Sequence, residues 1–96
     1  MTLNSDTNTS KRRRRRKFTL WLLDDSVNTV DHVCDTIRNT VPGYNSLRAE
    51  QVAIIAHHNG KAELCSMYIP DIYVVQAELM KYGLTVQLTP KISKQR

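Results

Sequence analysis

The alternation of apolar and polar positions predicts, from residue 18 on, a strand followed by a helix. Residues 18–23 form an apolar, β-prone run, which is typical of a strand buried largely on both faces. Small polar residues follow, and Asn28 or Thr29 can cap a helix. Apolar side chains then recur at the spacing of one helix face, until Pro42 and Gly43 end the pattern: Val30, Val33, Cys34, Ile37 and Val41.

A second helix and a second strand are expected next. Asn45 and Ser46 can cap the helix, which runs out at the turn signal of Asn59 and Gly60. Residues 61–68 alternate loosely and predict a strand. The helix between these signals has a narrow apolar side made mostly of small residues: Ala49, Val52, Ala53 and Ala56.

The pattern closes with a third helix and a third strand. Pro70 suits the first position of the helix, and Gly83 is placed to stop it in a left-handed conformation. Residues 84–89 alternate between apolar and polar, as expected of a half-buried strand. The apolar stripe of this helix consists of Ile72, Val75, Leu79 and Tyr82.

The order β-α-α-β-α-β predicts a single small α+β domain over residues 18–90. Three short strands need a hydrophobic cover, so we expect a three-stranded antiparallel sheet with three amphipathic helices packed on one face. The 96 residues of the chain fit one domain with a compact core. Residues 91–96 form a polar C-terminal tail.

Charge is distributed unevenly along the chain. The net charge is +5, but residues 11–17 are an unbroken run of seven positive side chains. Residues 18–90 contain eight acidic and four basic residues, so the predicted domain is acidic. A block of like charge repels itself and stays solvated, which predicts a disordered polybasic extension over residues 1–17.

Several classes of protein are disfavoured by composition. The longest apolar stretches are too short to cross a bilayer, and the N-terminus is polar where a secretory signal would be apolar, so we expect a cytoplasmic protein with no membrane contact. Cys34 and Cys65 lie inside periodic segments and are expected to be small buried side chains, with neither a disulfide nor metal ligation.

An enzyme is not expected. A metal-dependent hydrolase could be imagined from the adjacent pairs Asp24-Asp25 and His57-His58, but adjacent residues rarely ligate one ion together. The chain has no His-Glu-x-x-His motif, no cysteine pair at ligand spacing and no Gly-rich phosphate loop. We therefore expect no catalytic residues, no metal and no cofactor.

Asp24, Asp25 and His57 are the candidate binding residues. A free α-amine is a cation with three donor hydrogens, and a pocket that recognises it needs acceptors and negative charge that converge on one point. The two aspartates lie at a strand-to-helix junction, and His57 lies at the end of the second helix. Taken singly, both features are also explained by the favourable interaction of charge with helix ends.

Three segments of the chain together resemble the ClpS adaptor family. They are residues 22–33 (LLDDSVNTVDHV), residues 54–62 (IIAHHNGKA) and residues 81–84 (KYGL). The resemblance covers roughly residues 18–89, and the family has the same order of elements. It implies an adaptor that captures N-degron substrates, whose first residue is typically Leu, Phe, Tyr or Trp, and delivers them to a ClpA- or ClpC-like AAA+ unfoldase.

The resemblance also implies the roles of individual residues. Aligned without gaps, the family's amine-binding residues fall on Asp24, Asp25 and His57. If the turn contains one inserted residue, Leu23 takes the place of Asp24. The family's hydrophobic pit would be lined by Leu22, Val27 or Asn28, Val30, Val33, Ala53, Ala56 and Leu84.

Two departures from the family pattern bear on ligand choice. Asp24 replaces an Asn, which changes an amide that donates and accepts into a carboxylate that only accepts. Val30 and Ala53 stand where the family often has Met. These smaller side chains predict a wider or differently shaped pit. We therefore expect the pit to differ in its tolerance for substrates whose first residue is a bulky aromatic or is β-branched.

The family's unfoldase-docking surface lies around the start of the third helix and uses charged residues. Its acidic residue falls on Pro70 or Asp71, and its Lys falls near Val75. In the family, the N-terminal extension is a segment that can enter the pore of the unfoldase.

Nucleic-acid binding is the rival hypothesis. Residues 11–17 would neutralise several phosphates and give binding that is steeply salt-dependent and blind to sequence. The predicted domain itself is acidic, and the sequence identifies no stacking platform in it, only Trp21 or a Tyr as an exposed aromatic. The rival therefore depends on the extension alone.

Overall fold

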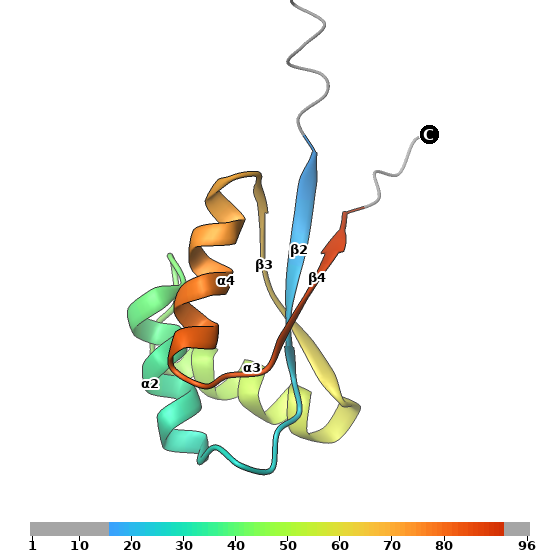
Figure 1. Cartoon of the computed structure of the whole chain (residues 1–96). Coiled ribbons are helices and arrows are strands. Elements are labelled where there is room, and N and C mark those ends of the chain that lie inside the picture. The colour runs from blue at the N-terminus through green and yellow to red at the C-terminus, as the bar shows by residue number, and fades with distance from the viewer. Residues whose placement is uncertain (1–15, 92–96) are drawn as a thin grey trace, which may run out of the picture.

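The computed structural model describes residues 16–91, which form one α+β domain (Figure 1). Residues 1–15 and 92–96 lie outside the described part, so most of the predicted extension and tail is not tested. The elements follow the predicted order: β2 (Lys17–Leu23), α2 (Val30–Thr40), α3 (Ser46–Asn59), β3 (Lys61–Tyr68), α4 (Asp71–Lys81) and β4 (Val86–Pro90).

The three strands form an antiparallel sheet in the order β3-β2-β4. The first strand of the described residues, β2, is therefore the central one, which explains why its sequence is apolar almost throughout. The register against β3 shifts between Leu20 and Trp21, while the pairing with β4 is regular. The predicted antiparallel sheet is confirmed.

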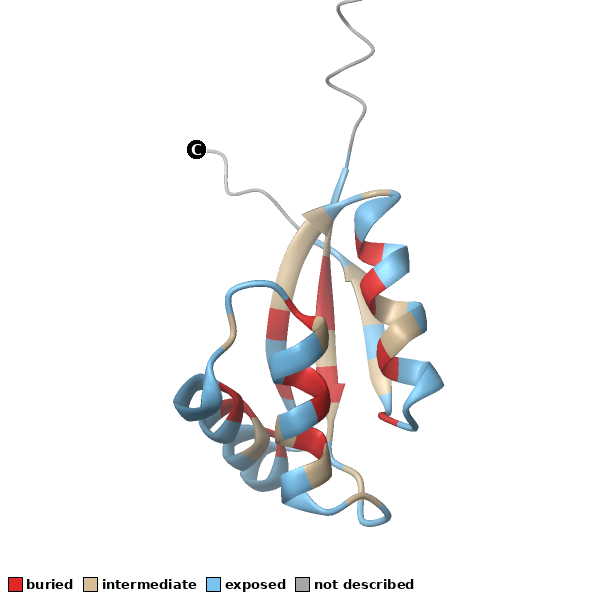
Figure 2. Ribbon diagram, turned by 90° about the vertical axis from the view of Figure 1, so that its left-hand side faces the viewer, coloured by how far each residue is buried: buried red, intermediate tan, exposed pale blue. Residues whose placement is uncertain are grey.

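All three helices lie on the same side of this sheet, as predicted (Figures 1 and 2). Helices α3 and α4 contact the strands, and α2 packs on these two helices. From the central strand, Leu20 and Leu22 are directed into the layer between sheet and helices, where both are buried. The helices contribute apolar side chains at helical spacing, chiefly Val33, Ile37, Ala49, Val52, Ala56, Ile72, Val75 and Leu79.

Helix ends are defined by the residues that the sequence singled out. Thr29 caps α2, and its hydroxyl accepts a hydrogen bond from the His32 amide at 3.1 Å. After α3 and α4 the chain reverses through Gly60 and Gly83, whose φ angles of 92° and 89° lie in the left-handed region that glycine adopts without steric cost.

Four details differ from the predictions. Pro70 is the N-cap of α4 and not its first helical residue, because the Pro70 carbonyl already accepts a hydrogen bond from the Tyr73 amide. Tyr82 is 50% exposed and lies outside the core, because α4 has already ended. Leu84 is buried but precedes β4, which begins at Val86, and β2 begins one residue early, at Lys17.

The two cysteines are free and part-buried, without a disulfide between them. Burial raises the pKa of both thiols, with nearby carboxylates adding to the effect, so neither thiol is activated as a nucleophile. Over residues 16–91, no three His, Cys, Asp or Glu side chains gather closely enough to hold a metal ion. The same stretch contains no helix that could cross a membrane.

Candidate functional site

The turn between β2 and α2 is attached to the ends of two other helices. The backbone amide of Asp24 donates to the carbonyl of Gly60 at 2.9 Å, which joins the start of the turn to the end of α3. The side-chain amide of Asn28 donates to the carbonyl of Gly83 at 2.8 Å, which joins the end of the turn to the segment after α4. Residues far apart in the sequence thus meet around residues 24–28.

Asp25 organises the inside of this turn. Its carboxylate accepts hydrogen bonds from the Val27 amide and the Asn28 side-chain amide, each at 2.7 Å, and from the Thr85 hydroxyl at 3.2 Å. The Val27 amide is the largest cause of a lowered pKa of the Asp25 carboxyl, followed by Asn28. Asp25 is therefore an ionised group that already has several donors around it.

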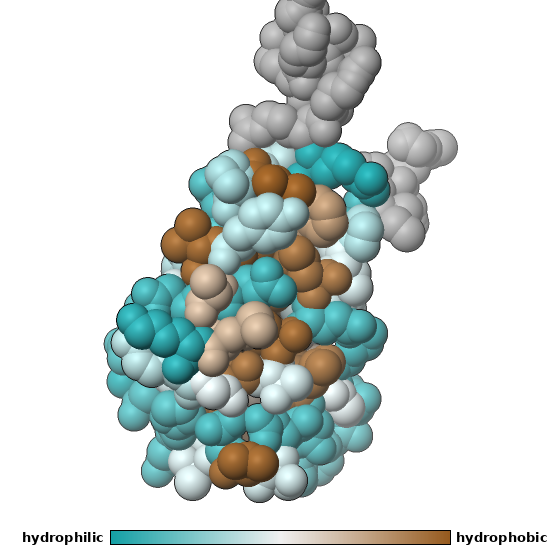
Figure 3. Space-filling view, in the orientation of Figure 1, coloured by the Kyte–Doolittle hydropathy of each residue, from teal (hydrophilic) through white to brown (hydrophobic). Residues whose placement is uncertain are grey.

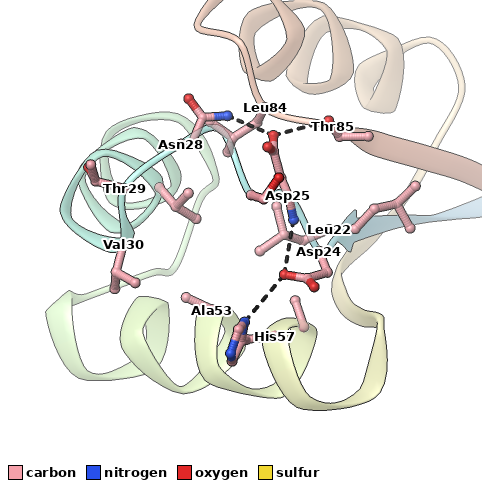
Figure 4. Close-up of a pocket in the computed structure, with 14 residues that line it drawn as sticks. Leu22, Asp24, Asp25, Asn28, Thr29, Val30, Ala53, His57, Leu84 and Thr85 are labelled. Atoms are coloured by element: carbon pink, nitrogen blue, oxygen red, sulfur yellow. Dashed lines mark hydrogen bonds and ion pairs between the residues drawn. The ribbon is translucent and has the colours of Figure 1, made fainter.

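Asp24 is directed to the other side of the turn, toward α3 (Figure 4). Its Oδ1 lies 3.5 Å from Nδ1 of His57 and accepts a hydrogen bond from the Asp25 amide at 3.0 Å. Both side chains are substantially exposed, 47% for Asp24 and 75% for His57. A carboxylate and an imidazole thus stand side by side at the surface, with room for a further polar group.

Next to this pair is a pocket of about 390 Å³. Its apolar floor comes from β2, α2, α3 and the segment before β4, through the buried side chains of Leu22, Val33, Ala56 and Leu84. Val30, which is 60% exposed, and Ala53 lie at its sides (Figure 4). The result is an apolar hollow with Asp24, Asp25 and His57 among its lining residues.

The structure brings together in this pocket every residue predicted from the sequence except Val27. Val27 is 87% exposed and does not line the hollow, whereas its stated alternative, Asn28, does. Of the two residues that the alignment alternatives assign to the amine site, Asp24 has its carboxylate beside His57. The other, Leu23, lines the pocket as well. All of the remaining predicted residues line the pocket: Leu22, Asp24, Asp25, Val30, Val33, Ala53, Ala56, His57 and Leu84.

Four lining residues were not predicted: Leu23 as a wall residue, Ser26, Thr29 and Thr85. Thr85 is the most informative of them, because its hydroxyl reaches Asp25 and its carbonyl accepts a hydrogen bond from the Leu23 amide at 3.0 Å. The sequence contained one indication of this role, because Thr85 directly follows Leu84, which was predicted to line the pit.

The predicted partner-docking residues divide into two groups. Pro70 and Asp71 are exposed at the start of α4. Val75 is only 8% exposed and belongs to the core, so it offers a docking partner almost no surface. Its assignment to the partner surface was therefore wrong. The exposed large apolar side chains of α4 are Tyr73, Val74 and Met80, of which Tyr73 and Val74 lie in its first turn.

The fold and the pocket define a small α+β domain with an acidic-rimmed apolar hollow. The model of a family described as ATP-dependent Clp protease adaptor protein ClpS matches residues 13–86, so the chain belongs to the ClpS family. That family is an adaptor family and not a family of catalysts. No curated protein matches the chain.

A solved structure supports the fold independently. The chain resembles Agrobacterium tumefaciens ClpS2 bound to L-phenylalaninamide, with a TM-score of 0.68. The match covers 81% of this chain and 100% of the other, at 15% sequence identity. An identity this low means that the likeness concerns the fold.

The hydrogen bonds to Asp25 predict a measurable titration. Because they stabilise its ionised form, its pKa in the folded protein should lie below the ordinary value of an aspartate, and Asn28→Ala should raise it toward that ordinary value. The corresponding contribution to stability is present above the unfolded pKa of about 3.9 and is lost as the pH falls through the lower folded pKa. Carbon-detected NMR titration of the Asp25 carboxyl in both proteins measures the shift; equal pKa values would contradict this view of the turn.

Proposed function

We propose that the pocket binds the first residue of a polypeptide, with its free α-amine at Asp24 and His57 and its side chain in the apolar hollow. The observation that carries this proposal is the carboxylate–imidazole pair, 3.5 Å apart, at the edge of a 390 Å³ apolar pocket. The protein would act as an N-degron adaptor that binds substrates and breaks no bond in them.

The amine end of the site follows from elementary chemistry. An α-ammonium carries a positive charge and three hydrogens, and its reference pKa is about 8. The Asp24 carboxylate supplies negative charge and acceptor oxygens, and a neutral His57 with its proton on the nitrogen facing Asp24 leaves the other nitrogen as an acceptor. An internal peptide N–H has one hydrogen and no charge, so the same groups discriminate against it.

Asp25 has an indirect part in this proposal. Its carboxylate is already used by the turn, through Val27, Asn28 and Thr85. It adds negative potential at the pocket, and its bonds to Val27, Asn28 and Thr85 hold the turn in the conformation in which the backbone amide of residue 25 donates to the Asp24 carboxylate. Both aspartates are thus needed, one as a contact and one as the support of that contact.

The hollow supplies the second requirement. Burying a Leu or Phe side chain is worth about 1.5–3 kcal/mol, which makes a bulky apolar first residue a condition for tight binding. L-phenylalaninamide, the ligand in the ClpS2 structure, has a free α-amine and a benzyl side chain. That pair of groups matches the two ends of the pocket described above.

Delivery to a ClpA- or ClpC-like AAA+ unfoldase is the second half of the proposed function. Pro70 and Asp71 are exposed at the start of α4, and Tyr73 and Val74 follow on its outer side. Apolar side chains gather on the face of the molecule where α4 lies (Figure 3). We assign unfoldase docking to this surface. A partner of this kind also agrees with the cytoplasmic location expected from the sequence.

Removal of the amine contacts should weaken peptide binding. Asp24→Ala and His57→Ala are each expected to reduce affinity for a peptide beginning with Leu about 10- to 100-fold, the range of one lost charge-assisted hydrogen bond. Glu50→Ala is the control, since Glu50 is an exposed acidic residue of α3 that does not line the pocket. Fluorescence anisotropy measures the affinities, and equal binding of the N-acetylated peptide would rule out amine recognition.

The shape of the hollow predicts selectivity among first residues. With Val30 and Ala53 at its sides, we expect peptides beginning with Leu, Phe, Tyr, Trp, Ile and Val to bind with different affinities. Ala53→Met fills part of the hollow and should lower the affinity for Trp more than that for Leu. The same anisotropy assay ranks all six, and six identical affinities in the unmodified protein would exclude a selective hollow.

A further inference from the structure

The face of the sheet opposite the helices carries a concave surface of its own. A hollow of about 480 Å³ there is lined only by residues of the strands and the residue after β4: Thr19, Trp21, Lys61, Thr89, Pro90 and Lys91. The alternation along β2 explains this placement, because Leu20 and Leu22 are directed to the core and Trp21 lies between them. We call these six residues, together with Lys17 and Tyr68, the open face.

Two aromatic rings on the open face are held in fixed positions. The indole Nε1 of Trp21 donates to the Thr89 hydroxyl at 2.8 Å, and the Lys61 ammonium lies 4.6 Å from the centroid of the indole ring. The Lys17 ammonium lies 5.5 Å from the centroid of the Tyr68 ring. Tyr68 pairs with Lys17 across the two strands, so both rings lie on one side of the sheet.

Charge on the domain is segregated by face. The open face has three lysines, and one carboxylate, that of Glu63, pairs with Trp21 and therefore lies on the same side of the sheet. The other seven acidic residues of the described domain lie on the helices or in the turn after β2. An acidic domain therefore presents a basic sheet surface.

The basic run of the sequence ends in a residue of this surface. Residues 11–17 are all Lys or Arg, and the last of them, Lys17, is the first residue of the central strand. The Lys91 amide donates to the Lys17 carbonyl at 2.9 Å, so two lysines of the open face meet where that run enters the sheet. Lys17 thus belongs both to the basic run of the sequence and to the open face.

We propose that the open face binds single-stranded nucleic acid, with bases stacked on Trp21 and Tyr68 and phosphates at Lys17, Lys61 and Lys91. Stacking on aromatic side chains within a basic groove is how proteins bind single strands without sequence preference. A base on Trp21 would take the place that the Lys61 ammonium occupies and would leave that ammonium to a phosphate. This surface is separate from the apolar hollow beside Asp24 and His57, because the two share no lining residue.

A single strand fits these features better than an acidic protein or a duplex does. An acidic protein would use the lysines but would have no need of two rings on the same side of the sheet. In a duplex the bases are stacked on one another and show only their edges, so they cannot cover the rings. The sequence alone did not predict a stacking surface here, because Trp21 is far along the chain from Thr89 and Lys61 and no local pattern indicates that they are in contact.

The single tryptophan of the chain makes the proposal testable with the full-length protein. Titration with an oligouridylate RNA of about 12 nucleotides, within the usual size of a single-strand site, should quench the Trp21 fluorescence as binding saturates. Heparin, a polyanion without bases, should bind through charge but leave the emission almost unchanged. Equal quenching by heparin or by poly-glutamate, or RNA binding without quenching, would overturn the proposal.

Charge reversal on the two sides of the domain provides the matched comparison. Lys61 and Lys81 each lie over an aromatic ring, Lys61 on the open face and Lys81 over Tyr82 at the end of α4. Lys61→Glu should lower RNA affinity about tenfold and reduce the slope of log affinity against log salt by about 0.7, whereas Lys81→Glu should do neither. Lys91→Glu repeats the test at a second lysine, and equal effects of the face and control variants would contradict the assignment.

Discussion

The turn after β2 is held between the carbonyl ends of two helices, and the rest of the site depends on that attachment. One end of the turn is bonded to the Gly60 carbonyl and the other to the Gly83 carbonyl. Both glycines have positive φ angles, which let each helix end abruptly and present a carbonyl to the turn. These two hydrogen bonds place the Asp24 carboxylate near the last turn of α3, where His57 lies.

The two neighbouring aspartates serve different physical purposes. Asp25 has its carboxylate surrounded by donors of the turn and of Thr85, which lowers its pKa and makes it a structural anion. Asp24 is directed toward His57 and keeps much of its surface exposed. In the proposed function this difference assigns contact with the ligand's charge to Asp24 and support of that contact to Asp25. An Asn at position 24 would supply a dipole where this chain supplies a charge.

Sequence periodicity predicted the fold well because the helices have apolar residues at helical spacing and the central strand is apolar almost throughout. Val33, Ile37, Leu20 and Leu22 are buried as their spacing requires, and Thr29 and Asn45 cap the helices they precede. Where prediction failed, the cause was a long-range contact or a boundary. The bonds from Asn28 to Gly83 and from Thr85 to Asp25 span most of the chain, and no local pattern announces them. Val75 was aligned to a docking position although its helical spacing places it in the core.

The central claim is that the Asp24–His57 pair and the adjoining hollow receive the first residue of a polypeptide. A crystal structure of the protein with a short peptide beginning with Leu tests this most directly. The account predicts the peptide's α-nitrogen within hydrogen-bonding distance of the Asp24 carboxylate and a ring nitrogen of His57, with the Leu side chain against Val30, Ala53 and Leu84. A peptide bound elsewhere, or one whose α-nitrogen faces solvent, would contradict the claim.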